Sequence, residues 1–156
     1  MRFFRGELDR ADVQALLGLH VAAMRASTPA DYCHVMPGDG LRDAAITFLS
    51  ARGDDGGLLG IGALKRLSAA EGPDEGEVKS MRVHPLALRR GVARGLLEAL
   101  TGKARAQGMA MLRLETGTAA LFDPAIALYR AAGFVETGPF AGYLSGPYNL
   151  FFAKAV

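Results

Sequence analysis

The sequence has its most informative pattern at residues 83–97, which read Val83-His84-Pro85-Leu86-Ala87-Leu88-Arg89-Arg90-Gly91-Val92-Ala93-Arg94-Gly95-Leu96-Leu97. These residues are typical of a strand end, a turn of small residues and the start of a helix. A helix N-terminus offers unpaired backbone N–H groups and the positive end of the helix dipole. Neither Gly91 nor Ala93 places a bulky side chain in front of these groups. We therefore predict that the turn binds a phosphate group.

Two known phosphate-binding patterns do not fit this turn. It lacks the Gly-Lys-Ser/Thr ending of a Walker loop and the three glycines of the dinucleotide fingerprint. The charge around it favours an anionic ligand, because residues 82–105 contain six basic residues and one acid, whereas the whole chain has a formal charge of only +2. A second interpretation stays open, in which Gly91 makes a tight turn and the arginines belong to a solvated helix face.

The segments on both sides of the turn predict a strand–helix–strand unit. A strand at residues 75–84 leads into a helix whose apolar residues recur at helical spacing: Ala93, Leu96, Leu97, Leu100 and Ala104. Gly108 ends the helix, and residues 109–115 form the next strand. Because a helical crossover joins strands that run parallel, we expect these two strands to be parallel in one sheet.

The rest of the chain alternates between further strands and helices. Apolar patterns predict strands at residues 2–8, 44–51, 58–67, 134–140 and 149–155, and helices at residues 11–26 and 123–133. Residues 52–57 indicate a hairpin turn, and residues 27–41 predict a long irregular loop of the kind that often has a function. We therefore predict a single domain of the α/β (α+β) class over residues 1–156.

The composition argues against several classes of protein. Half of the 156 residues are hydrophobic and 22% are charged, which is typical of an ordered domain. Cys33 is the only cysteine, so the chain can form no internal disulfide and no zinc site built on cysteine pairs. The N-terminus has no apolar run of signal-peptide length, and no stretch approaches the roughly 20 apolar residues that span a bilayer. We predict a cytoplasmic protein that has no membrane partner.

Two motifs resemble those of the GNAT superfamily of acyl-CoA-dependent N-acyltransferases. Residues 88–93 fit the family pattern Gln/Arg-x-x-Gly-x-Gly/Ala at Gly91 and Ala93, with Leu88 in the first position. Residues 129–134 match the family pattern Tyr-x-x-x-Gly-Phe. The resemblance covers essentially the whole chain. It implies one GNAT-like domain with a mixed sheet of about six to seven strands, a splayed parallel pair and about four flanking helices.

The resemblance also implies a cosubstrate, acetyl-CoA, and no metal. In the family, the pantetheine arm pairs with the backbone of the strand before the turn, which corresponds to Met81, Arg82 and Val83. The pyrophosphate then lies on the backbone N–H groups of the turn and the helix start. These residues are Arg89, Arg90, Gly91, Val92, Ala93 and Arg94, whose three arginines can also screen the phosphates.

Tyr129 matches the family tyrosine that protonates the departing thiolate, a task that suits a phenol. A packing role for this aromatic ring stays open. The family often has Asn about seven residues before the tyrosine, where this chain has Phe122, and we expect the neighbouring Asp123 to be a helix cap.

Three residues are candidates for the base that accepts the proton of the acceptor amine. Glu77 lies fourteen residues before Gly91, the spacing of the general-base glutamate in the histone-modifying branch of the family. We expect Glu77, Lys79 and Met81 to share one face of their strand. Glu115 ends the next strand, and His34 lies in the long loop. For each of them a purely structural role is the alternative.

The resemblance implies transfer of an acetyl group to a small-molecule amine by direct attack through a tetrahedral intermediate. We expect the acceptor to lie against residues 27–41 and the C-terminal segment that contains Tyr143 and Tyr148. Leu88 and the missing Asn favour an alternative, a catalytically inactive acyl-CoA-binding module. A nucleic-acid partner is not expected, because one short basic stretch stands alone without a known motif. Family members are often dimers, so a homodimer is a candidate assembly.

Overall fold

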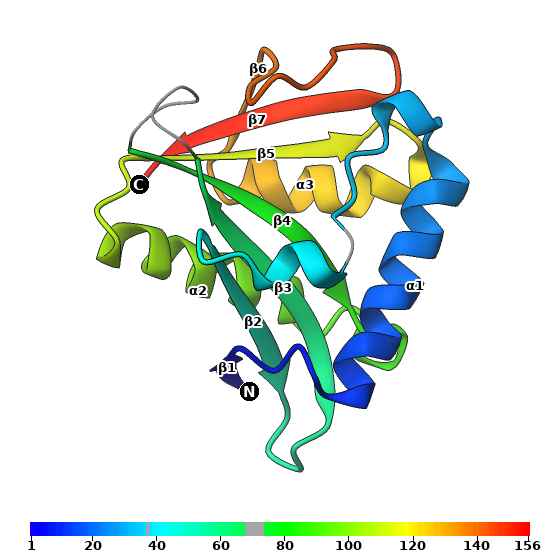
Figure 1. Cartoon of the computed structure of the whole chain (residues 1–156), viewed down its shortest axis with the longest axis vertical. Helices are drawn as coiled ribbons and strands as arrows, with labels where there is room; N and C mark the ends of the chain where they lie inside the picture. Colours follow the sequence, from blue (N-terminus) through cyan, green and yellow to red (C-terminus); the bar gives the residue numbers. More distant parts are fainter. Residues whose placement is uncertain (37, 68–73) are drawn as a thin grey trace.

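A seven-stranded mixed sheet runs through the molecule in the order β1-β2-β3-β4-β5-β7-β6 (Figure 1). The structure, a computed structural model, describes residues 1–36, 38–67 and 74–156. The strands are β1 (Arg2–Arg5), β2 (Ile46–Arg52), β3 (Leu58–Arg66), β4 (Glu75–Val83), β5 (Met111–Gly117), β6 (Val135–Thr137) and β7 (Asn149–Ala155). The mixed α/β sheet predicted from the sequence is confirmed.

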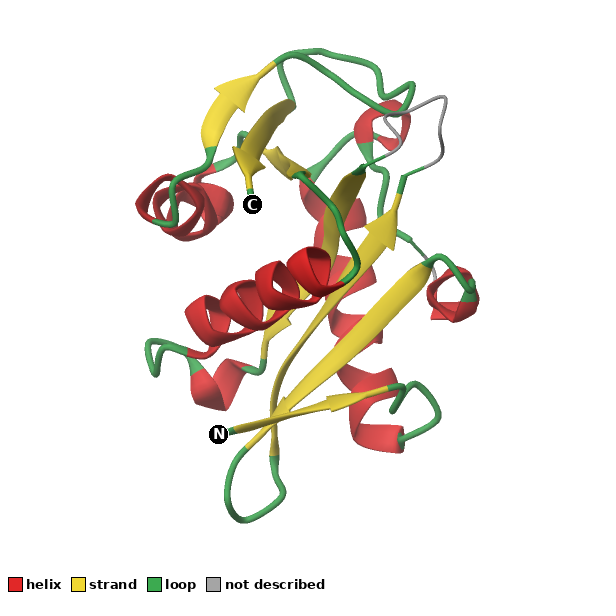
Figure 2. Cartoon of the chain, turned by 90° about the vertical axis from the view of Figure 1, so that its left-hand side faces the viewer, coloured by secondary structure: helices red, strands yellow, loops and turns green. Residues whose placement is uncertain are grey.

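Three α-helices pack on this sheet, where the family resemblance implies about four. They are α1 (Ala11–Ser27), α2 (Val92–Ala106) and α3 (Asp123–Ala131). Four short 3-10 helices complete the described structure: η1 (Ala30–Tyr32), η2 (Gly38–Arg42), η3 (Pro85–Ala87) and η4 (Ala120–Phe122). Figure 2 shows α2 and α3 on one face of the sheet and α1 on the other. None of the described helices is long and apolar enough to cross a membrane.

The parallel pair of β4 and β5 holds together over only three residues. Glu75, Gly76 and Glu77 pair with Met111, Leu112 and Arg113, and the strands then diverge. Beyond that point β4 stays paired with β3 as far as Val83, and β5 stays paired with β7 as far as Gly117. The expected splayed parallel pair is therefore confirmed, and it divides the sheet into two halves (Figure 1).

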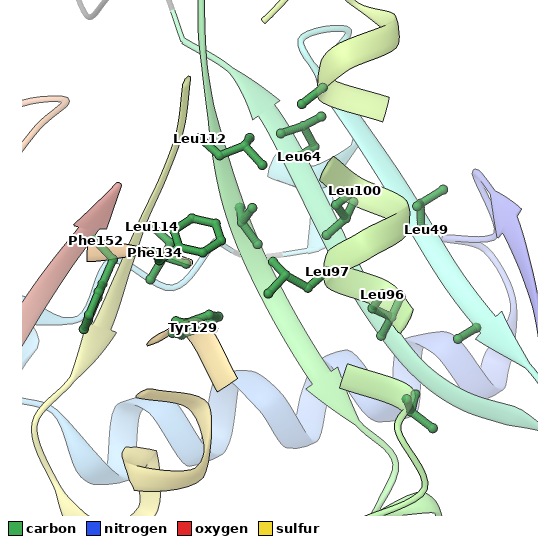
Figure 3. Close-up of a cluster of buried hydrophobic side chains, with 14 of the residues drawn as sticks. Leu49, Leu64, Leu96, Leu97, Leu100, Leu112, Leu114, Tyr129, Phe134 and Phe152 are labelled. Carbon is green, nitrogen blue, oxygen red and sulfur yellow. The ribbon is translucent and has the colours of Figure 1, made fainter. Parts of the chain in front are cut away.

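Helix α2 packs closely on β3 because two glycines of that strand leave room for it. A Cβ atom at Gly60 would lie 3.0 Å from Val92, and one at Gly62 would lie 3.1 Å from Leu100. The apolar face of α2, with Leu96, Leu97 and Leu100, joins the larger buried cluster of the molecule (Figure 3). The second large cluster lies on the opposite face and contains the buried side of α1, together with Ile61 and Ala63 of β3.

A bulge in β4 changes which side chains face α1. Ala63 pairs with Lys79, but Ile61 pairs with Arg82, so β4 has one residue more than β3 between these pairs. Ser80 takes a left-handed conformation with a φ of 51° at this point. Lys79 and Arg82 therefore share the α1 face of the sheet, whereas Met81 packs against the cluster around α2. The expectation that Met81 shares a face with Glu77 and Lys79 is wrong because the bulge shifts the alternation.

An ion-pair cluster around Arg52 ties the start of α1 to the sheet. The side chain of Arg52 is only 5% exposed, and its Nε lies 2.7 Å from Glu7 Oε2. Its Nη1 lies 2.7 Å from Asp12 Oδ2 and also donates to the carbonyl of Gly56 at 2.9 Å. Since Glu7 precedes α1 and Asp12 lies in its first turn, this cluster determines where α1 crosses the sheet.

We predict that D12N reduces stability at neutral pH and has no effect in strong acid. The hydrogen bond from Arg52 lowers the pKa of Asp12 from 3.8 to about 2. Because the pKa is lower in the folded state, the carboxylate stabilises the fold above pH 3.8, and this contribution is lost as the pH falls through 2. We expect a loss of about 1 kcal/mol or less for this partly exposed side chain, measured by urea unfolding over a pH series. D31N is the control. A difference in unfolding free energy between D12N and the wild-type protein that does not change with pH would contradict the prediction.

Candidate active site

A cavity of about 210 Å³ lies where β4 and β5 separate. Its wall combines the α1 side of the molecule, with the loop after α1, and both diverging strands. The start of α3 and the beginning of β7 complete the wall. The cavity thus lies at the carboxyl end of a parallel strand pair, the usual place for ligands in sheets of this kind.

The β4 side of the cavity has an open backbone edge. Within the described residues, β4 pairs with β5 only as far as Glu77, so residues 78–83 are paired on the β3 side alone. Met81 and Arg82, two of the residues assigned to the pantetheine arm, line the cavity, and Val83 follows them on the same edge. An extended ligand that adds itself as a strand would satisfy these backbone groups.

The turn after β4 is open to solvent. Gly91 has a φ of 76° and directly precedes α2, and apart from its two chain neighbours no described residue lies within 4 Å of the position that its Cβ would occupy. Arg89, also left-handed with a φ of 60°, is exposed together with Arg90 and Arg94. The first backbone N–H groups of α2 follow directly after the open position at Gly91 and have no partner within the helix. Leu88, in the position of the family Gln/Arg, is 59% exposed.

Tyr129 lies on α3 and contributes to the cavity wall. Its ring packs edge-on against Phe134, with 6.0 Å between the ring centroids, and at a tilt against Phe152 (Figure 3). Burial raises the pKa of Tyr129 to about 12, so the phenol keeps its proton at neutral pH. Tyr129 is therefore both a residue of the core and a residue of the cavity wall.

The start of α3 differs from the expectation. Asp123 is already the first helical residue, the N-cap position belongs to Phe122, and no side-chain hydrogen bond caps this end. The prediction that Asp123 caps the helix is therefore wrong. Phe122 instead packs its ring over Gly117, where any side chain would collide with it.

A first polar cluster in the site joins Glu77, Lys79 and Tyr143. Lys79 Nζ lies 2.7 Å from Glu77 Oε1 and 2.6 Å from the Tyr143 hydroxyl. The same hydroxyl donates to Glu77 at 2.8 Å. The side chain of Glu77 is only 1% exposed and that of Lys79 only 8%, so the two charges are paired away from water.

A second polar cluster joins His34, Glu115 and Asn149. His34 Nδ1 lies 2.8 and 2.9 Å from the two oxygens of Glu115, and Asn149 Nδ2 donates to Glu115 at 2.8 Å. An ionised carboxylate can only accept, so Nδ1 of His34 carries the proton in this contact. The His34 ring stacks on Tyr143, with 4.5 Å between the ring centroids. Tyr143 therefore connects the two clusters.

Most of the residues predicted for catalysis and acceptor binding come together in one place. Tyr129, Glu77, His34 and Glu115 all line the cavity, and Tyr143 touches two of them. Asn149 and His20 also belong to this wall and were missed, because nothing in their sequence context distinguishes them from a strand start and a buried helix position. Within the described ranges, no group of three or more His, Cys, Asp or Glu side chains could hold a metal ion.

Comparison with known sequences connects this site to one family. The model of the acetyltransferase (GNAT) family matches residues 15–134. The chain is also 38% identical to the uncharacterized N-acetyltransferase YsnE of Bacillus subtilis, over 149 residues that cover 95% of both proteins.

Solved structures agree with this match. A Klebsiella pneumoniae protein described as an acyl-CoA N-acyltransferase superimposes with a TM-score of 0.76 at 28% identity, over 99% of this chain and 96% of that one. A Bacillus subtilis acetyltransferase in complex with CoA superimposes with a TM-score of 0.72 over 99% of this chain and 98% of that one. At 17% identity, the second comparison shows a shared fold.

We predict that K79M is strongly destabilising and that adding E77Q restores part of the loss. The single substitution leaves the carboxylate of Glu77 buried without its cation, which should reduce the free energy of unfolding by about 3–5 kcal/mol. In the double variant E77Q/K79M no unpaired charge remains, so the loss should be smaller. Urea unfolding of the four proteins in this mutant cycle measures the coupling. If the double variant lost the sum of the two single effects, Glu77 and Lys79 would not be an energetically coupled pair.

Proposed function

Because the chain belongs to the acetyltransferase (GNAT) family, we propose that it is an acetyl-CoA-dependent N-acetyltransferase that acts on a small-molecule amine. Acetyl-CoA is the cosubstrate that supplies the activated acetyl group. The observation that carries this proposal is the open backbone edge of β4 beside a cavity with a buried phenol in its wall.

The arrangement of the groups suits an acyl-CoA. The edge at Met81, Arg82 and Val83 can pair with the amides of the pantetheine arm, as a strand would. The exposed turn at residues 89–94 follows this edge and offers N–H groups and three arginines to the pyrophosphate. An acyl-CoA whose pyrophosphate lies on the turn and whose pantetheine arm lies along the β4 edge places its thioester in the cavity that Tyr129 lines.

The side chains in the cavity supply the two proton transfers that the reaction needs. The amine nitrogen bonds to the thioester carbonyl carbon, and the carbon–sulfur bond breaks as the tetrahedral intermediate collapses. Tyr129, which keeps its proton at neutral pH, donates it to the departing sulfur. A base must take one proton from the amine nitrogen.

Of the three candidates for the base, Glu77, Glu115 and His34, the hydrogen bonds favour His34. The carboxylate of Glu77 already accepts from Lys79 and Tyr143 and is 1% exposed. His34 uses Nδ1 to bond Glu115, which fixes the ring and leaves Nε2 to accept a proton. The side chain of His34 is also 24% exposed, so a substrate can reach it. Glu115, held by Asn149, stabilises the imidazolium that forms.

We predict that Y129F keeps the affinity for acetyl-CoA but loses turnover. The phenylalanine preserves the packing against Phe134 and Phe152 and removes the proton donor, which should lower kcat by about 100-fold or more. Isothermal calorimetry with acetyl-CoA and a screen of amines measure the two properties separately. If the wild-type chain bound no CoA thioester, the proposed function would be wrong.

The same experiment tests the second candidate, an acyl-CoA-binding module without chemistry. Leu88 in the Gln/Arg position and Phe122 in the Asn position favour this candidate. A module would bind acetyl-CoA without acetylating any amine, and Y129F would then change no measurable property.

We predict that H34Q lowers kcat by about 100- to 10,000-fold and keeps the affinity for acetyl-CoA, because it removes the group that takes the proton from the amine. Steady-state kinetics with the acetylated amine and calorimetry with acetyl-CoA measure the two properties. E77Q serves as the comparison, since our assignment predicts a much smaller loss of kcat in the folded variant. The reverse pattern, with kcat kept in H34Q and lost in E77Q, would assign the base to Glu77.

A further inference from the structure

One cation in the cavity wall has no counter-ion among the residues that the structure describes. Within the described part of the chain, the wall contains two carboxylates, and both already have partners: Glu77 pairs with Lys79, and Glu115 pairs with His34. Arg82 contributes to the same wall, and no described carboxylate forms an ion pair with it. The wall therefore contains one guanidinium that forms no ion pair with a described carboxylate, and a guanidinium suits an oxyanion.

A buried imidazole in the same wall has one ring nitrogen without a partner among the described residues. His20 lies on the buried side of α1 and lines the cavity at 8% exposure. Its Nδ1 is buried, and no hydrogen bond reaches it from the described residues. Burial, and to a smaller extent the charge of Arg82, lowers the pKa of His20 to about 4. The ring is therefore neutral at pH 7 and can donate one N–H without adding a second positive charge.

The bulge in β4 is what places these two residues on the same side. Arg82 pairs with Ile61 and shares the face on which α1 packs, whereas its neighbour Met81 faces α2. The backbone of Arg82 belongs to the open β4 edge, and its side chain belongs to the α1 side of the cavity. Figure 1 shows α1 running beside the end of β4. Residue 82 can thus serve the cosubstrate through its main chain and the acceptor through its side chain.

We propose that Arg82 and His20 form a carboxylate-binding site for the acceptor, so that the substrate is an amine that also carries a carboxylate group. The proposal rests on the proposed acetyltransferase function and specifies its acceptor class. The guanidinium binds both carboxylate oxygens, and the His20 N–H donates to one of them. The unpartnered imidazole and the unpaired arginine are then both satisfied by one ligand group.

The experiment compares matched acceptors that differ only in the carboxylate. Alanine, phenylalanine and glutamine are each assayed beside their carboxamides, and 4-aminobutyrate is assayed beside butylamine, with wild-type protein, R82Q and H20F. For the wild-type protein we expect kcat/KM to favour the carboxylate member of a pair by about 10- to 100-fold. R82Q should raise KM for that member by a similar factor and leave its carboxamide unchanged. R82K should recover part of the loss, and R25Q, which removes an exposed arginine of α1, should behave as wild type.

Binding is also followed without turnover. The same compounds are titrated into ¹⁵N-labelled protein, and the shifts of the His20 ring and the Arg82 Nε–H group are recorded. We expect both signals to shift and saturate with the carboxylates, and the carboxamides to need about 10- to 100-fold higher concentrations. In R82Q, where only the His20 ring is recorded, we expect the carboxylates to bind as weakly as the carboxamides. Because this readout needs no acetyl transfer, it tests the carboxylate site even if the protein proves to be a binding module.

Three results would overturn the proposal. The first is equal binding of carboxylates and carboxamides to the wild-type protein. The second is a preference for carboxylates that R82Q does not reduce. The third is a loss of acetyl-CoA affinity in R82Q, measured by calorimetry, that is as large as the loss of activity in this variant. That result would assign the side chain of Arg82 to the cosubstrate. If acetyl-CoA did not bind the wild-type protein, the proposed function would be refuted instead. Calorimetry with acetyl-CoA detects this outcome independently of the acceptor titrations.

Discussion

The short pairing between β4 and β5 is the constraint on which the rest of the site depends. Three paired residues on each strand hold the two halves of the sheet together, and the strands then separate while each keeps its other neighbour. The separation leaves backbone donors and acceptors of β4 at an open edge, which is unfavourable unless water or a ligand satisfies them. The packing of α2 and α3 on one face and of α1 on the other maintains this opening (Figure 2).

Buried charge maintains the shape of the cavity. Glu77 and Lys79 come from the α1 face of β4, and His34 and Glu115 come from the loop after α1 and from β5. Each pair has a further hydrogen-bonding partner, Tyr143 for the first and Asn149 for the second, as buried charges require. Since Asn149 also bonds the carbonyl of Leu144, these contacts fix the segment before β7 over the cavity. Both the proposed proton transfers and the proposed acceptor site rely on this arrangement.

Several parts of the protein followed from local sequence. The small residues of the turn at Gly91, the apolar spacing of α2 and the strand that follows it predict the parallel unit without any long-range information. The motif that begins at Tyr129 placed a phenol in the site, and the family assignment from these two motifs agrees with the family match. Each of these features depends on neighbours within one or two helical turns, where periodicity and backbone preference are strong.

What the sequence determined by itself is the order of the elements, the small-residue turn at Gly91 and the family. The tertiary structure alone decided which side chains share the cavity. His34 and Glu115 are 81 residues apart, and their contact exists because the loop after α1 crosses the end of β5. Arg82 lies on the face of the sheet on which α1 and His20 pack only because the bulge at Ser80, a residue that rarely takes a positive φ, shifts the alternation of β4. The alternation of side chains between the two faces of a strand is predictable from the sequence. A bulge, however, is set by packing on both faces of the sheet, and no local sequence pattern contains that information.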